Sequence, residues 1–189
     1  DGIANETTKT VTVNDQFGDR VLRETYVYTG SDYQRVAWNV NIYNNDHKVT
    51  ASYSSNNTEI SATWNCCNKE SSTSADGTEY TYSYDLLKRL SSRTKKGHNG
   101  TEDIITSYTY DAIGRRLSTT RTGGSLSLTT SREYDGAGRV TKSVDQAGLE
   151  TTYAYENGGR KVTVTTPGGF TRVTEKYLDG RIKSVTGSA

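Results

Sequence analysis

The sequence predicts an all-β protein of about eight stacked antiparallel β-hairpin repeats, which form one long curled or spiralling, β-solenoid-like sheet. Three observations predict this fold: 14 Tyr residues, 18 Gly residues against a single Pro, and a motif that returns at intervals of 21 to 26 residues. Aromatic and β-branched residues favour strands, and glycine favours the tight turns between them. The 189 residues suffice for one domain or a short repeat array.

The repeat is clearest in residues 78–189, where well-formed copies follow one another. Residues 108–115 read Tyr-Thr-Tyr-Asp-Ala-Ile-Gly-Arg, and related stretches recur on both sides. The tyrosine anchors are separated by 26, 24, 21 and 22 residues: Tyr84, Tyr110, Tyr134, Tyr155 and Tyr177. Residues 1–77 contain degenerate copies in the same phase, so we expect one continuous repeat domain.

Each copy has the pattern of a β-hairpin. Alternation in Thr151–Tyr155 places Tyr153 and Tyr155 on one face of a strand. An Asp-x-x-Gly turn follows, with glycine where a positive φ is needed, and Lys88 takes the glycine position in one copy. A second alternating strand, such as Val140–Val144, completes the unit, and no segment sustains a helical period. A hairpin cannot bury its own apolar face, so we expect the units to stack around a thin core of tyrosine rows.

The anchors of the repeat have four structural roles. Tyr ends the first strand, Asp opens the turn, Gly takes the positive φ, and Arg leaves the turn. The arginine can lie across a neighbouring tyrosine ring or pair with the aspartate of the adjacent unit. Besides the five tyrosines, these anchors are Asp85, Arg89, Asp111, Gly114, Arg115, Asp135, Gly138, Arg139, Gly159, Arg160, Gly180 and Arg181.

These residues resemble the RHS, or YD-repeat, family, whose unit runs Tyr-x-Tyr-Asp-x-x-Gly-Arg-Leu. The resemblance covers residues 78–182 well and residues 11–77 weakly. It implies a spiralling β-sheet, often a hollow shell, within large secreted or cell-surface proteins. Bacterial members encapsulate toxins, and animal teneurins carry related repeats.

For this chain the resemblance implies a bacterial, secreted or surface fragment whose partners are neighbouring repeats or domains of its parent protein. The family's repeats are non-catalytic, so no catalytic residue is carried over. The chain has no Asp-Pro pair, and the self-cleavage that some members perform is therefore not expected here.

Composition excludes several other functions. A net charge of +1 disfavours nucleic-acid binding, which needs a basic surplus or stripe. No run approaches the roughly 20 apolar residues of a membrane span. With only two His and no Cys-x-x-Cys, the chain offers no metal site, and no cofactor motif is present. We therefore expect a chain that is not an enzyme.

Two local features remain as candidate sites. Cys66 and Cys67 form either a vicinal disulfide or simply fill the variable positions of a turn. Adjacent Cα atoms lie about 3.8 Å apart, below the roughly 4.4–6.8 Å usual for a disulfide, so a bridge would force a tight turn. Four aromatic residues of the degenerate repeats in residues 1–77 can pack between repeats or bind a glycan: Trp38, Tyr43, Tyr53 and Trp64.

The sequence thus supports two functions of different classes. The first is a non-catalytic extracellular module that serves as a scaffold or shell wall. The alternative is a carbohydrate-binding module that uses the exposed tyrosine and tryptophan rings.

Overall fold

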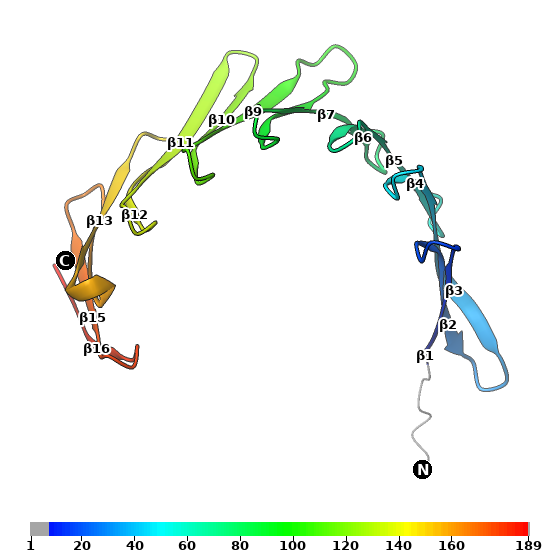
Figure 1. Ribbon diagram of the computed structural model, residues 1–189, viewed down its shortest axis with the longest axis horizontal. Helices are drawn as coiled ribbons and strands as arrows, with labels where there is room; N and C mark the ends of the chain where they lie inside the picture. Colours follow the sequence, from blue (N-terminus) through cyan, green and yellow to red (C-terminus); the bar gives the residue numbers. More distant parts are fainter. Residues whose placement is uncertain (1–7, 189) are drawn as a thin grey trace. The chain divides into compact units, whose positions relative to one another are not determined.

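The computed structural model describes residues 8–188 and confirms the predicted all-β class. Sixteen antiparallel strands form one open sheet, in the order in which they follow one another along the chain (Figure 1). In the described range, the single helical element is a 3-10 turn, η1 (Asn157–Gly159). The strands are β1 (Thr8–Asn14), β2 (Arg20–Tyr28), β3 (Tyr33–Tyr43), β4 (Val49–Ser54), β5 (Glu59–Trp64), β6 (Lys69–Thr73), β7 (Glu79–Tyr84), β8 (Leu90–Lys95), β9 (Ile104–Tyr110), β10 (Arg116–Gly123), β11 (Leu126–Tyr134), β12 (Val140–Val144), β13 (Glu150–Glu156), β14 (Lys161–Thr165), β15 (Thr171–Lys176) and β16 (Ile182–Gly187).

Each strand pairs with the strand that follows it in the chain. The sixteen strands of residues 8–188 can therefore be grouped into eight successive hairpins, from β1–β2 to β15–β16. This number agrees with the number of repeats that the sequence predicts. Contacts divide the chain into two compact units, Asp1–Ser83 with Arg93–Thr101, and Tyr84–Ser92 with Glu102–Ala189. The two units are described separately below.

The Asp-x-x-Gly turns follow one geometry, which residues 85–89 illustrate. The amide of Asp85 donates to the carbonyl of Arg89 at 2.9 Å, and the amide of Lys88 donates to the carbonyl of Asp85 at 2.9 Å. The Asp85 carboxylate accepts the amides of Leu87 and Arg89, both at 2.9 Å. The fourth residue has a positive φ, 64° at Lys88, 90° at Gly114 and 83° at Gly138. These contacts form a turn closed by a bulge, the geometry that makes glycine favourable at the fourth position.

The sheet differs from the expectation in its core. No residue between 8 and 188 is buried, and the tyrosine rows are only half-buried. In each unit the ribbon shows a single layer of strands, with no second layer on either face (Figure 1). The expected thin core is therefore absent, because one layer cannot enclose a side chain. Contacts between neighbouring hairpins must replace it.

Strand register defines two different faces in the second unit. Thr119 pairs with both Tyr108 and Thr130, and Arg132 pairs with Ser143. Directly paired residues share a face, and alternation along each strand extends it. This tyrosine face carries Tyr108, Tyr110, Tyr134, Tyr153 and Tyr155. The opposite face carries hydroxyl pairs, of which Thr109–Ser118 at 2.7 Å and Thr120–Thr129 at 3.0 Å are examples.

Candidate functional site

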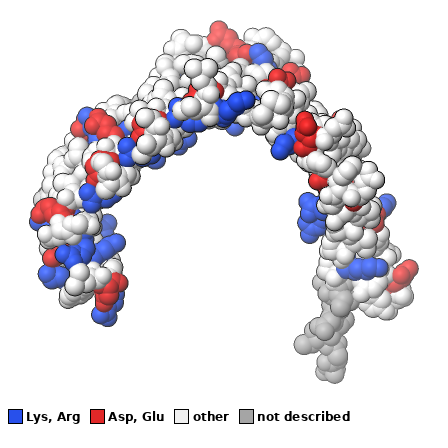
Figure 2. Space-filling view, viewed as in Figure 1, with Lys and Arg blue, Asp and Glu red and all other residues white. Residues whose placement is uncertain are grey.

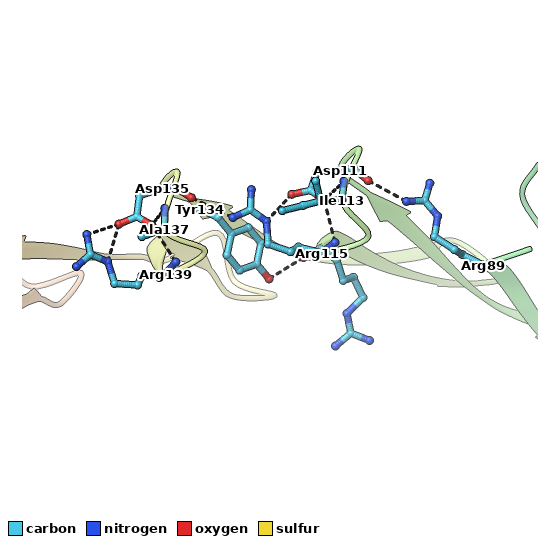
Figure 3. Close-up of polar contacts among 9 residues, drawn as sticks. Arg89, Asp111, Ile113, Arg115, Tyr134, Asp135, Ala137 and Arg139 are labelled. Carbon is cyan, nitrogen blue, oxygen red and sulfur yellow. Dashed lines mark hydrogen bonds and ion pairs between the residues drawn. The ribbon is translucent and has the colours of Figure 1, made fainter. Parts of the chain in front are cut away.

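The strongest repeated feature of the second unit is a set of contacts around the arginine that leaves each Asp-x-x-Gly turn. Within its own turn, the Arg115 Nε atom donates to the Asp111 carboxylate at 2.6 Å (Figure 3). The same carboxylate accepts the Arg115 amide at 2.8 Å. Asp111 therefore orients the guanidinium while its other oxygen shapes the turn.

The same arginine also reaches the next repeat. Its Nη1 atom donates to the backbone carbonyl of Asp135 at 3.0 Å, and its guanidinium lies 4.7 Å from the ring centroid of Tyr134. The Tyr134 hydroxyl donates back to the carbonyl of Arg116 at 3.0 Å (Figure 3). We call this group of contacts the arginine clasp, since it joins two successive hairpins through one side chain.

Neighbouring turns repeat the clasp. Arg89 donates to Asp85 at 2.7 Å and to the carbonyl of Asp111 at 2.8 Å, and lies 4.9 Å from the Tyr110 ring centroid. The Tyr110 hydroxyl donates to the carbonyl of Leu90 at 2.8 Å. The clasp of Arg89 thus joins the β7–β8 hairpin to the β9–β10 hairpin.

The third clasp is centred on Arg139. This arginine donates to Asp135 at 2.7 Å and lies 4.4 Å from the Tyr155 ring centroid. The Tyr155 hydroxyl donates to the carbonyl of Val140 at 2.9 Å. The three successive arginines therefore share the contacts with the aspartate of their own turn and with the tyrosine ring of the next unit, and Arg89 and Arg115 also donate to a backbone carbonyl of that unit.

Of the two arrangements that the sequence left open for the arginine, the three clasps show the stacking on a neighbouring tyrosine ring but not the pairing with the carboxylate of the adjacent unit. The guanidinium stacks on the tyrosine of the next unit, and its carboxylate partner is the aspartate of its own turn. The next unit's aspartate contributes its backbone carbonyl instead. The tyrosine hydroxyl bond to the carbonyl after the arginine was not expected from the sequence, because the register between hairpins sets it.

Hydrogen bonds from the arginine that leaves the turn lower the pKa of the clasp aspartates. Hydrogen bonds from the amide and the guanidinium of Arg139 hold the pKa of Asp135 below its ordinary value. At Asp85 and Asp111, partial burial opposes ionisation, but hydrogen bonds from the following arginine still lower the pKa of each carboxyl. All three carboxylates are therefore stabilised in their charged form.

The repeats of the last two arginine anchors, Arg160 and Arg181, differ in geometry from the three clasps. Arg160 is exposed, and its carbonyl accepts the amide of Lys176, which stands where the other repeats have a tyrosine. Tyr177 lies inside the following turn, since its amide donates to the Arg181 carbonyl at 2.9 Å. The sequence aligned Tyr177 with the other tyrosine anchors and expected a shortened turn, but the turn has the same length as the others and Tyr177 occupies its first position, where they have aspartate. Arg181 pairs with Asp179 at 2.7 Å and its side chain is 81% exposed.

The first unit contains altered versions of the tyrosine contact. The Tyr43 hydroxyl donates to the carbonyl of Arg20 at 2.9 Å. Trp64 takes the tyrosine position in the next repeat, where its Nε1 atom donates to the carbonyl of Val49 at 2.8 Å. The ammonium group of Lys69 lies 5.1 Å from the tryptophan ring centroid. A cation and an aromatic ring thus meet here too, with different residue types.

The four aromatic residues considered for glycan binding are divided between the two faces of the sheet. Val40 pairs with Tyr53, which places Trp38 and Tyr53 on one face, and alternation places Tyr43 and Trp64 on the other. The Tyr53 hydroxyl donates to the Glu59 carboxylate at 3.1 Å, which raises the pKa of Tyr53. No single surface presents all four rings.

The two cysteines lie at an exposed turn between β5 and β6. No disulfide joins them, and their Sγ atoms are 2.9 Å apart. Within residues 8–188, no group of three or more His, Cys, Asp or Glu side chains could hold a metal ion. The same range contains no helix that is long and apolar enough to cross a membrane. Acidic and basic side chains are interspersed along the visible surface (Figure 2).

Comparison with known families supports the repeat assignment. Residues 134–171 match the family model described as RHS Repeat, and this stretch includes the turn and the tyrosine of the third clasp. The chain is thus an antiparallel β-repeat protein in its fold. More particularly, it contains an RHS repeat, which confirms the resemblance seen in the sequence. No curated protein matches the chain.

Several solved structures are similar at low identity. The Photorhabdus luminescens Tc holotoxin pore with a mutated TccC3 is 13% identical over 94% of this chain and 14% of its own, with a TM-score of 0.36. A TcdB2–TccC3 structure without the hypervariable C-terminal region is 14% identical over 92% and 13%, with a TM-score of 0.38. A porin-like protein from Bacteroides uniformis is 14% identical over 98% and 91%, with a TM-score of 0.45. The chain spans about a seventh of the first of these.

Proposed function

We propose that this chain is a non-catalytic structural module, a segment of scaffold or shell wall in a larger secreted or surface protein of bacterial origin. The observation that carries the proposal is the row of three arginine clasps at Arg89, Arg115 and Arg139. In each clasp, the guanidinium is paired with the carboxylate of its own turn and lies against the tyrosine ring of the next hairpin. Side chains committed in this way are oriented for assembly rather than for a reaction.

The single-layer sheet also supports a structural role. A module of this kind presents two open faces to neighbouring domains or repeats, and its strands are held by the hairpins beside them. The RHS repeat at residues 134–171 agrees with this role, because the resemblance implies repeats that build a wall. We therefore propose neighbouring repeats or domains of the parent protein as its partners.

Carbohydrate binding remains the alternative, and the aromatic side chains define its test. Two of the four rings, Tyr43 and Trp64, use their polar atoms in bonds to backbone carbonyls of the preceding repeat. Trp38 and Tyr53 lie on the opposite face. This division favours the structural role, since a sugar platform needs several rings on one surface.

Binding to a panel of soluble and insoluble polysaccharides distinguishes the two functions. We expect no saturable binding by the unmodified chain, measured by glycan array and by pull-down. Trp38→Ala probes one face and Trp64→Ala probes the other. Saturable binding that either substitution abolishes would contradict the structural proposal and support a carbohydrate-binding module.

A further inference from the structure

Cys66 and Cys67 are the two central residues of the turn formed by residues 65–68 between β5 and β6. The amide of Asn65 donates to the carbonyl of Asn68 at 3.0 Å, which closes the hairpin. The Asn65 side-chain oxygen accepts the amides of Cys67 at 3.0 Å and Asn68 at 2.7 Å. An asparagine thus shapes this turn without a carboxylate.

This loop differs in two respects from the Asp-x-x-Gly turns of the second unit. The Asp-x-x-Gly turns hold a residue at positive φ, whereas none of residues 66–68 has one. Those turns also pair their carboxylate with the arginine that leaves them, as Asp111 pairs with Arg115. Here Lys69 leaves the turn and lies over the Trp64 ring. Because residue 65 is an asparagine, this turn has no carboxylate–arginine pair of that kind.

The two thiols are placed to act together. Their Sγ atoms are 2.9 Å apart, and both residues are exposed at the tip of the hairpin. A small oxidant can reach them there, and each sulfur has the other as its nearest possible partner. Reaction between them is therefore intramolecular and does not depend on protein concentration.

We propose that Cys66 and Cys67 form a vicinal dithiol that closes to an intramolecular disulfide by exchange with a small disulfide such as oxidised glutathione. One cysteine thiolate attacks a sulfur of glutathione disulfide, whose S–S bond breaks and releases one glutathione thiolate. The other cysteine thiolate then attacks the bound cysteine sulfur and releases the second glutathione. The protein loses two electrons and two protons, and one glutathione disulfide becomes two glutathione thiols.

Closure would add a covalent restraint to this turn. A bond between the two side chains fixes both loop residues, so amide exchange in β5 and β6 slows in the oxidised chain. The reduced chain opens this hairpin more often. The pair is thus a modification site that controls the local stability of one repeat, whichever function the whole module has.

Oxidation of the purified chain tests the proposal directly. The chain is treated with glutathione disulfide and analysed by mass spectrometry and thiol counting. We expect both reactive thiols to be lost, the mass to fall by about 2 Da, and the chain to remain monomeric. Hydrogen exchange should then show slower exchange confined to residues 59–73, and dithiothreitol should reverse both changes.

Single-cysteine variants are the matched controls. Cys66→Ser and Cys67→Ser each leave one thiol, which should give a stable mixed disulfide with glutathione instead of a closed ring. A stable mixed disulfide, a disulfide-linked dimer or two unreacted thiols in the unmodified chain would overturn the proposal. Closure without slower exchange in β5 and β6 would overturn the effect on stability.

Discussion

One aspartate shapes each well-formed turn in two ways. Asp111 accepts the amides of Ile113 at 3.1 Å and Arg115 at 2.8 Å through one oxygen, and the guanidinium through the other. In the first unit, Asn44 accepts the amides of Asp46 and Lys48 at 3.0 and 2.9 Å. An amide therefore suffices for the turn, but only a carboxylate also orients an arginine by charge.

The fourth turn position provides a prediction at the same scale. Lys88 has a φ of 64°, where a side chain is unfavourable and glycine is not. We expect Lys88→Gly to raise the free energy of unfolding by roughly 0.5–1 kcal/mol, after the greater entropy of glycine in the unfolded chain is deducted. Urea unfolding followed by circular dichroism measures the change.

The reciprocal substitution is its control. Gly114 has a φ of 90°, and a Cβ atom there would meet no other atom within 4 Å. Gly114→Lys should therefore lower stability through backbone conformation alone. A stabilising Gly114→Lys, or a destabilising Lys88→Gly, would show that the φ angle does not govern this position.

Successive hairpins depend on one another through the clasp. Arg115 contacts its own turn through Asp111 and the next hairpin through Tyr134 and the Asp135 carbonyl. One side chain therefore adds to the stability of both hairpins. In repeat arrays, stability is approximately the sum of unit terms and contacts between neighbours, so local losses remain local.

Replacing this arginine tests the coupling. We expect Arg115→Gln to lower stability by roughly 1–2 kcal/mol, because the charged hydrogen bond and the contact with the tyrosine ring are both lost. Faster amide exchange should appear in the β9–β10 and β11–β12 hairpins together. Arg132→Gln, at an exposed position of β11, is the matched control. It should leave the stability and the amide exchange of both hairpins unchanged. Faster exchange in only one hairpin would refute coupling through Arg115.

Across the second unit, the charged clasps predict how stability responds to pH. The pKa values of Asp85, Asp111 and Asp135 are lowered in the folded chain. The unfolded chain binds protons at a higher pH, near the ordinary aspartate pKa of about 4. The stabilisation is therefore complete above that pKa and is lost as pH falls through the folded pKa values.

Urea unfolding between pH 7 and pH 2 measures this loss, and the urea midpoint should fall most steeply below about pH 4. Asp135→Asn should reduce stability at pH 7 and flatten the decline in acid. Asp145→Asn is the control. Asp145 shapes a turn of the same kind, but the residue that follows this turn is Leu149 and not an arginine. An equal response of the two variants would argue against the clasps as the acid-sensitive contacts.

Much of the fold could be predicted, because the repeat carries its own local signals. Asp111, Gly114 and Arg115 mark one turn, and alternating tyrosines mark the strand before it, so strands and turns follow from neighbouring residues. Tyr177 shows the limit of this reasoning. It stands at the first position of a turn of the usual length, where the other repeats have aspartate, and the spacing of the tyrosines alone could not distinguish this position from the strand end.

The candidate site was predictable in its residues but only partly in its contacts. The sequence pointed to Arg115, Asp111 and Tyr134 as anchors and to the stacking of the arginine on a neighbouring ring, but it expected the ion pair with the aspartate of the adjacent unit instead of Asp111 of the same turn. It did not indicate that Tyr134 bonds the carbonyl of Arg116, or that Trp64 bonds that of Val49. Backbone carbonyls have no residue-specific signal, so such bonds appear only when the hairpins are aligned.

By itself, the sequence determined the strands, the turns and their repetition, because these depend on side-chain alternation and on φ preferences within a few residues. Tertiary structure decided how successive hairpins meet, and therefore which face each aromatic ring occupies and which groups form the clasps. It also decided that the described chain has no buried core. The physical reason is that register and layering depend on contacts between residues about twenty positions apart, such as Arg115 and Asp135.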